Sequence, residues 1–418
     1  MLLDLPPHIL IEILWRLPSE SVCCIRCVSK PLLKTAEDLY FVSLHTRRLL
    51  SATTNAVVGH QVPQLMSFAA PYRPERLVVA AVMQSVKYDG SALTTRGNSA
   101  IKVSASKSRL YGTPPYVIDF VFCNLFCFKN KYDSLQGVCF LIDPLRGKVL
   151  RLPKNDITSQ RQHPEVILQL RDWYGMGFDN ITNTLKILRV IQFPGWNRDS
   201  MVAQVLILGT SSWRQIPSSS PFPFFIFSHL FYQKNACAYG DMHWLDAAGQ
   251  AFRIISFDFT KEEFCLTPHP NIQSSDDGYS LHLHLLTLRG SLALVHASLL
   301  EGMTTKIEVW VLKDYHKKEW TRDYSINIKM FDLYKEFGWS EDVTCGEWEH
   351  GIFFKNLNKI NAFFLDLRYA NSMNHVTYGT GNNNKIWSYT GSLISLKDYY
   401  SSLIEAERFL SGYYHEYM

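Results

Sequence analysis

Apolar residues at the start of the chain recur with the spacing of one face of an α-helix. The members of this face are Leu5, Ile9, Leu10, Ile13, Leu14 and Leu17. Pro6 and Pro7 suit the first turn of a helix, where backbone N–H groups have no intrahelical acceptor, and Pro18 favours its end. The pattern therefore predicts a helix that ends near residue 17 and has a broad apolar face in need of a partner.

Further helical segments are predicted to follow in quick succession. Ser19 is placed to cap a second helix over residues 19–28, and Ser29 a third that carries Pro31 in its first turn. A fourth stretch, 38–50, ends in arginines that complement the helix dipole. Helices of this size bury little surface alone, so such a module often shares its apolar face with another protein.

Beyond a polar stretch that ends near residue 64, short apolar runs alternate with polar turns. Residues 138–152 place the turn Asp143–Gly147 between two strand-like runs, which predicts a hairpin. Similar units of strand, polar turn and strand recur at residues 178–183, 208–212, 257–263, 312–318 and 365–368. Blade repeats of propellers run about 40 to 50 residues. We therefore predict a mainly β body of about six to eight blades, with a pair of β-sandwiches as the alternative.

Composition narrows the class of protein. Apolar residues make up 47% of the chain and charged residues 19%, which predicts a folded protein. The net charge of +4 is small and scattered, so nucleic acid is not the expected partner. The N-terminus lacks the basic start of a signal peptide, and no apolar run is long enough to predict a membrane span. Nine cysteines without a framework spacing indicate reduced thiols, and hence the cytoplasm and/or nucleus.

Several short motifs in the sequence are candidates for a metal site or a nucleotide-binding loop. Cys24 and Cys27 form a CxxC pair without a second pair at zinc spacing, so helix packing is their expected role. His282 and His284 share a predicted strand face, but no third ligand is evident. The glycine pairs at 175–177 and 379–381 lack the third glycine of a dinucleotide loop and are interpreted as turns. We therefore predict a protein that is not an enzyme and that uses no metal and no cofactor.

Three segments near the N-terminus resemble the F-box motif: Leu5–Leu10, Ile13–Pro18 and Arg26–Lys30. Phe41 and His45 match the C-terminal positions of the motif. The resemblance implies contact with a Skp1-type adaptor, and through it a cullin, by Leu5, Pro6, Ile9, Leu10, Ile13, Leu14 and Val28. Helix residues also pack on each other, so Leu5 and Pro6 are the better interface candidates. Leu32 stands where the family usually has Trp, which predicts a weaker adaptor contact.

The body resembles the F-box-associated domain of plant F-box proteins, a kelch-like propeller family. The segments that resemble this family are residues 177–179, 209–216, 240–245, 255–258 and 307–312. The resulting domain hypothesis is an F-box over 1–45, a linker over 46–64, a propeller over 65–395 and a helical tail over 396–418. The resemblance implies a substrate-recognition subunit of an SCF-type ubiquitin ligase that binds an unknown target protein. The alternatives are an interaction scaffold without ubiquitination and a glycan-binding or sugar-oxidising propeller.

Overall fold

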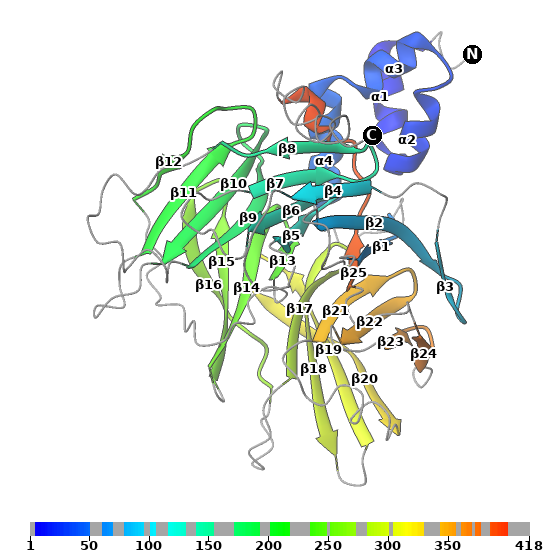
Figure 1. The fold of residues 1–418 in the computed structure, drawn as a ribbon, viewed down its shortest axis with the longest axis vertical. Helices are drawn as coiled ribbons and strands as arrows, with labels where there is room; N and C mark the ends of the chain where they lie inside the picture. The colour runs from blue at the N-terminus through cyan, green and yellow to red at the C-terminus, as the bar shows by residue number, and fades with distance from the viewer. Residues whose placement is uncertain are drawn as a thin grey trace.

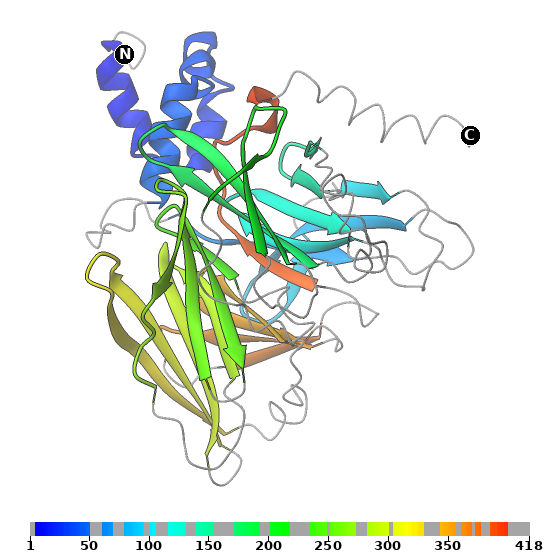
Figure 2. The same cartoon turned by 90° about the vertical axis from the view of Figure 1, so that its left-hand side faces the viewer.

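The structure of this protein is a computed structural model. It describes residues 5–50, 61–69, 79–95, 101–105, 116–130, 139–153, 171–192, 201–217, 235–248, 251–272, 282–300, 304–329, 343–356, 361–369, 373–377 and 385–399. Two parts are evident: a small group of helices and a ring of β-sheets, with the helices seated at one end of the ring (Figure 1 and Figure 2). The fold is mainly β, as predicted.

The N-terminal helices surround a small apolar core of their own. Their bounds are α1 (Pro7–Trp15), α2 (Ser19–Ile25), α3 (Lys30–Ala36) and α4 (Leu39–Leu50). Ser29 caps α3 as predicted, because its side chain accepts a hydrogen bond from the Leu32 N–H. The cap predicted at Ser19 is wrong, because the Ser19 hydroxyl donates instead to the backbone oxygen of Gly391 at 2.7 Å. None of the helices described is long and apolar enough to span a membrane.

The described strands form six antiparallel sheets, which are the blades of a propeller. The first blade contains strands from both ends of the chain: β25 (Lys385–Tyr389), β1 (Gln64–Ala69), β2 (Val79–Tyr88), β3 (Leu93–Thr95) and β4 (Ile101–Ala105). Blade 2 is β5 (Tyr116–Phe122), β6 (Leu125–Asn130), β7 (Cys139–Asp143) and β8 (Lys148–Arg151). Blade 3 is β9 (Arg171–Asp179), β10 (Thr184–Gln192), β11 (Met201–Ile207) and β12 (Arg214–Gln215).

The remaining three blades follow the same order along the chain. Blade 4 is β13 (Asn235–Ala238), β14 (Asp241–Ala248), β15 (Ala251–Asp258) and β16 (Glu263–Thr267). Blade 5 is β17 (His282–Leu288), β18 (Ser291–Leu300), β19 (Thr304–Asp314) and β20 (Glu319–Lys329). Blade 6 is β21 (Val343–Trp348), β22 (Gly351–Asn356), β23 (Asn361–Asp366) and β24 (Met373–Thr377). A short 3-10 helix, η4 (Leu396–Asp398), follows β25, and the rest of the predicted helical tail lies outside the described residues.

The ring is closed by a strand from near the C-terminus. β25 pairs antiparallel with β1, in a register that sets Tyr389 opposite Gln64 and Lys385 opposite Phe68. β25 completes the first blade with strands from both ends of the chain, and the strand edges that remain in a propeller are short and protected from pairing with other chains. Six blades lie within the predicted range, and the alternative of two β-sandwiches is excluded.

One turn recurs in four blades and explains the spacing of the polar runs in the sequence. Its aspartate accepts the backbone N–H groups two and three residues ahead at 2.8 to 3.2 Å. Its fifth residue has a φ between 56° and 63°. The aspartate and the fifth residue are Asp143 with Gly147, Asp179 with Asn183, Asp258 with Glu262, and Asp314 with Lys318. The predicted hairpin at 138–152 is one of these turns.

The glycines at 175 and 177 are not in a turn, which corrects the prediction from sequence. Both lie inside β9, on the side of blade 3 that packs against blade 4. A Cβ on Gly177 would stand 2.0 Å from Cδ2 of Phe259, and one on Gly175 would stand 2.8 Å from Cζ2 of Trp244. Small residues are required here because aromatic rings of the next blade occupy the space. The pair at 379–381 lies outside the described residues.

Candidate functional site

The N-terminal helices expose an unusual share of the large apolar side chains. Of the ten such side chains that are exposed in the described part of the chain, five belong to residues 5–50. They are Ile9, Ile13, Val28, Leu39 and Tyr40, with exposed fractions from 37% to 73%. Exposed apolar side chains that are concentrated on one small module are candidates for contact with another protein. We call these five residues the apolar surface.

The seven residues predicted to bind the adaptor differ in their exposure to solvent. Ile9, Ile13 and Val28 are in the apolar surface, Pro6 is exposed, and Leu5 is half-buried. Leu10 and Leu14, in contrast, are 8% and 0% exposed. They pack inside the helices among Val22, Leu32, Phe41 and Val42. Leu10 and Leu14 therefore support the site from within, while the other five are available to a partner.

Sequence reasoning did not single out Leu39 and Tyr40. They begin α4 directly after Asp38, whose carboxylate accepts the N–H groups of Tyr40 and Phe41 at 3.0 and 3.1 Å. Phe41 turns into the core, so the two residues before it are directed outward. The signal available in the sequence was an aspartate cap followed by four consecutive apolar residues, which lie on more than one side of a helix and cannot all be buried.

The expected packing role of the CxxC pair is wrong. Cys24 and Cys27 are both exposed, and Cys23 is the thiol that packs partly against the helical core. Within the part of the chain that the structure describes, no three His, Cys, Asp or Glu side chains are grouped to hold a metal ion. The pair therefore provides two accessible thiols.

The helices are attached to one end of the propeller. Nη2 of Arg47, on α4, donates to the backbone oxygen of Asn180 at 2.7 Å and to Oδ1 of Asn183 at 2.6 Å. These residues form the turn between β9 and β10, so the turns between the first and second strands of the blades face the helices. Because neighbouring strands in a blade are antiparallel, the last strand of each blade ends, and the first strand of the next begins, at the opposite end of the propeller. The chain therefore passes from one blade to the next at the end of the propeller away from the helices.

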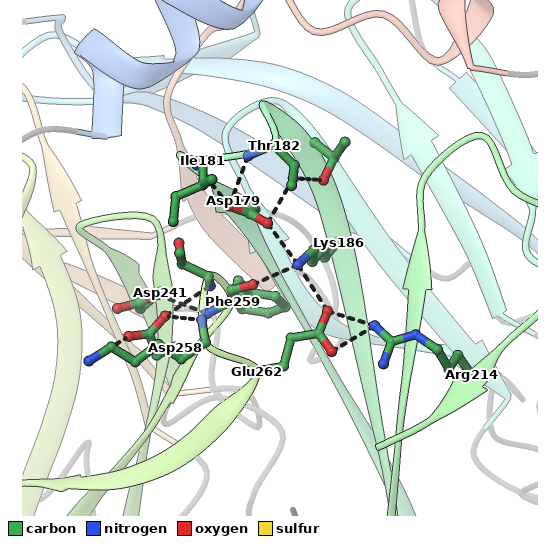
Figure 3. Close-up of polar contacts among 12 residues, drawn as sticks. Asp179, Ile181, Thr182, Lys186, Arg214, Asp241, Asp258, Phe259 and Glu262 are labelled. Carbon is green, nitrogen blue, oxygen red and sulfur yellow. Dashed lines mark hydrogen bonds and ion pairs between the residues drawn. The ribbon is translucent and has the colours of Figure 1, made fainter. Parts of the chain in front are cut away.

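The β9–β10 turn that receives Arg47 is held by a buried network between blades 3 and 4 (Figure 3). Nζ of Lys186 lies 2.8 Å from Oδ2 of Asp179 and 2.9 Å from Oε1 of Glu262, and it donates to the backbone oxygen of Phe259 at 3.0 Å. Burial lowers the pKa of Lys186, but the two carboxylates outweigh this effect, and the net shift is upward. Lys186 therefore remains charged and ties its own blade to the next.

A cavity of about 260 Å³ lies in the central channel, between the inner strands and the helices. The helical side contributes His45 and Arg48, and the propeller contributes Cys237, Cys345 and Glu347. Burial raises the pKa of both thiols, which keeps them protonated and poorly nucleophilic. Burial also raises the pKa of Glu347 to about 8, although its Oε1 accepts the Arg289 N–H at 2.7 Å. The two thiols and Glu347 are therefore mainly protonated, and hence neutral, near pH 7.

Glu347 predicts a specific pH dependence of stability. Its pKa rises from an ordinary 4.5 to about 8 on folding, so between these values the folded state binds more protons than the unfolded state. Stability therefore falls as pH rises through this range, by about 1.5 kcal/mol between pH 6.5 and pH 8. Asp241, whose pKa burial raises to about 7, adds a smaller loss in the same direction.

The measurement is urea unfolding at pH 6.5 and pH 8 of the unmodified chain and of Glu347→Gln. Glutamine retains an acceptor for the Arg289 N–H without a titrating proton. We expect the variant to lose less stability than the unmodified chain over this interval. Equal losses in the two proteins would show that Glu347 is not the group responsible.

Comparison with known proteins decides the family. The model of the F-box associated beta propeller domain matches residues 91–359, which is more than half of the chain. The chain belongs to this family. Its closed ring of six sheets is therefore an F-box-associated propeller, and the helices at residues 5–50 are in the position of the F-box.

The relatives that match most of the F-box-associated chain are plant F-box proteins. F-box protein At5g65850 of Arabidopsis thaliana is 26% identical over 328 residues, covering 76% of this chain and 70% of that protein. F-box protein CPR1 of the same plant is 22% identical over 363 residues, covering 81% and 78%. F-box/kelch-repeat protein At3g04660 is 23% identical over 345 residues, covering 79% and 75%. The predicted class, a plant F-box protein with a C-terminal F-box-associated propeller, is confirmed.

Solved structures resemble the chain only remotely. The fucose-specific lectin from Aleuria aurantia is 11% identical, with a TM-score of 0.32, over 79% of this chain and 97% of that one. AofleA from Arthrobotrys oligospora is 10% identical, with a TM-score of 0.33, over 80% and 92%. Similarity at this level says nothing about the ligand of the F-box-associated propeller.

Proposed function

We propose that this F-box protein is the substrate-recognition subunit of an SCF-type ubiquitin ligase. Its F-box binds a Skp1-type adaptor, the adaptor binds a cullin, and the propeller binds a target protein. The observation that supports this proposal is the apolar surface, which is exposed on a module seated at one end of a closed propeller. Ubiquitin chemistry takes place on other subunits, and this chain acts by holding the target close to them.

The target is proposed to bind at the end of the propeller away from the F-box. The chain passes from one blade to the next at that end. Loops on a rigid scaffold are the usual location of recognition residues. A target held there leaves the F-box free for the adaptor. The proposed compartment is the cytoplasm and/or nucleus, because all nine cysteines are free thiols.

The experiment that tests the proposal is co-expression of the full chain with a Skp1-type adaptor and cullin, followed by purification and an assay of ubiquitin transfer to bound proteins. We expect a stable complex and ubiquitination that depends on the chain. Failure of the folded chain to bind the adaptor would refute the proposal. Binding without ubiquitination would favour the scaffold function instead.

Leu5 and Pro6 provide a sharper test of the binding surface. Replacing both with Ala removes apolar contact area from the start of α1 without opening the helical core, because neither is a core residue. We expect adaptor affinity to fall about tenfold, with unchanged unfolding of the chain. The control is Leu266→Ala, which removes an exposed apolar side chain from β16 of blade 4. Unchanged adaptor affinity would reject the interface role of Leu5 and Pro6.

Leu32 gives little support to the scaffold alternative. It is 2% exposed and packs in the core of the F-box, where it touches the same cluster as Leu14 and Phe41. A smaller side chain than the Trp usual in the family is therefore accommodated by internal packing, and any effect on adaptor affinity is transmitted through the helices.

A further inference from the structure

Residues 390–396, which we call the strap, pass between the F-box and the propeller. They follow β25, the strand that closes the ring, and lead into η4. Gly391, Ser392, Leu393, Ile394 and Leu396 are all buried, although the segment has almost no regular secondary structure. A buried irregular segment is unusual because its backbone groups must find hydrogen-bond partners outside a helix or sheet.

Those partners come from both domains. The Ser19 hydroxyl of the F-box donates to the backbone oxygen of Gly391 at 2.7 Å. Arg146, in the blade 2 turn, donates to the backbone oxygens of Ile394 at 2.9 Å and Ser392 at 3.2 Å. Asn124, in the β5–β6 turn, also donates to the oxygen of Ile394 at 3.5 Å. The strap is therefore bonded to the F-box at its start and to the propeller at its end.

The side chains of the strap point into two different cores. Leu393 is 4% exposed and belongs to the core of the F-box, together with Leu10, Leu14, Val22 and Phe41. Ile394 and Leu396 are both 0% exposed and belong to the core of blades 2 to 4. Leu393 is thus a core residue of the F-box that the chain supplies more than 340 positions after α4 ends at Leu50.

We propose that the strap makes adaptor binding depend on a closed propeller. The proposal rests on the proposed function and adds a mode of control to it. Helices as short as those of the F-box bury little surface and are only marginally stable alone. One additional core residue therefore changes the fraction of molecules in which the F-box is folded. Leu393 reaches that core only when β25 has paired with β1, four residues earlier in the chain. A chain whose ring is open therefore presents a poorly ordered F-box and recruits little adaptor.

The direct test is Leu393→Asp in the full chain. A carboxylate in the F-box core disfavours the ordered helices, while residues of the apolar surface remain unchanged. We expect adaptor affinity to fall about tenfold or more, in proportion to the lost ordered fraction. We also expect faster amide hydrogen exchange in α1 and α4, with unchanged exchange in β9 to β20. Leu266→Asp, which places the same charge at an exposed position on β16 of blade 4, is the control and leaves both readouts unchanged.

A second pair of variants tests the coupling from the propeller side. Arg146 and Arg253 are matched: their side chains are 19% and 22% exposed, and each pairs with a fully buried aspartate, Asp143 and Asp246. Only Arg146 also holds the strap in the interactions described above. We expect Arg146→Met to speed amide hydrogen exchange in α1 and α4 and to lower the affinity for the adaptor. We expect Arg253→Met to speed amide hydrogen exchange in blade 4 and to change neither exchange in the F-box nor the affinity for the adaptor.

The outcomes separate this proposal from the proposed function. If the unmodified chain fails to bind an adaptor, the proposed function is refuted, and hydrogen exchange in the variants still decides whether the strap orders the F-box. If Leu393→Asp leaves both exchange in α1 and α4 and adaptor affinity unchanged, the strap proposal is overturned. It is also overturned if Arg146→Met and Arg253→Met act equally on the F-box.

Discussion

Replacing Lys186 with Met is expected to destabilise the protein by about 3–5 kcal/mol. The ammonium group is almost fully buried between Asp179 and Glu262, and its removal leaves their carboxylates close together without the cation between them. The methionine fills much of the volume of the lysine, so the loss is electrostatic and not a cavity effect. The same change loosens the β9–β10 turn that receives Arg47, and thereby the seat of the F-box (Figure 3).

The matched control for Lys186 is Arg214→Met. Arg214 binds the same carboxylate, with Nη2 at 2.7 and 2.6 Å from the two oxygens of Glu262, but its side chain is 55% exposed. An exposed ion pair contributes less than about 1 kcal/mol because water and salt screen it. Urea unfolding of both variants at pH 7 measures the difference. Equal destabilisation would mean that burial of Lys186 does not govern the strength of this network.

Local signals in the sequence predicted the boundaries of elements well. Proline, serine and aspartate act on backbone groups a few residues away, so the end of α1, the cap at Ser29 and the turn at Asp143 follow from residue type. The repetition of that turn also allowed the number of blades to be bracketed. These predictions succeeded because each depends on interactions within a few positions along the chain.

Contacts between distant segments account for what the sequence could not predict. Ser19 has the residue type of a helix cap, but its partner is Gly391, 372 positions away. The apolar stripe of α1 covers more than half of the helix, so the pattern could not tell the inward Leu10 and Leu14 from the outward Ile9 and Ile13. That choice is made by the positions of the other helices and of Leu393. The sequence therefore indicated the segment of the candidate site, and the structure shows which of its side chains are exposed and which are in the core.

Replacing Gly177 with Ala is expected to destabilise the protein by about 3 kcal/mol, the upper end of the usual cost of overpacking. The added Cβ would stand 2.0 Å from Cδ2 of Phe259 and 2.4 Å from the backbone oxygen of Gly240, so blades 3 and 4 must separate to admit it. The Phe259 ring is fully buried and packs against Phe257, which leaves it little room to turn. Thermal unfolding followed by tryptophan fluorescence measures the loss.

A double-mutant cycle with Phe259→Leu identifies the cause of the Gly177 effect. A smaller side chain at 259 makes room for the new methyl group, so the double variant should lose less stability than the sum of the two single changes. Gly147→Ala is the control, because a Cβ there meets nothing within 4 Å and its cost of about 1–2 kcal/mol comes only from its positive φ. Its effect should add to that of Phe259→Leu. If Gly177→Ala is also additive, contact between the blades at this point is not what requires a glycine at this position of β9.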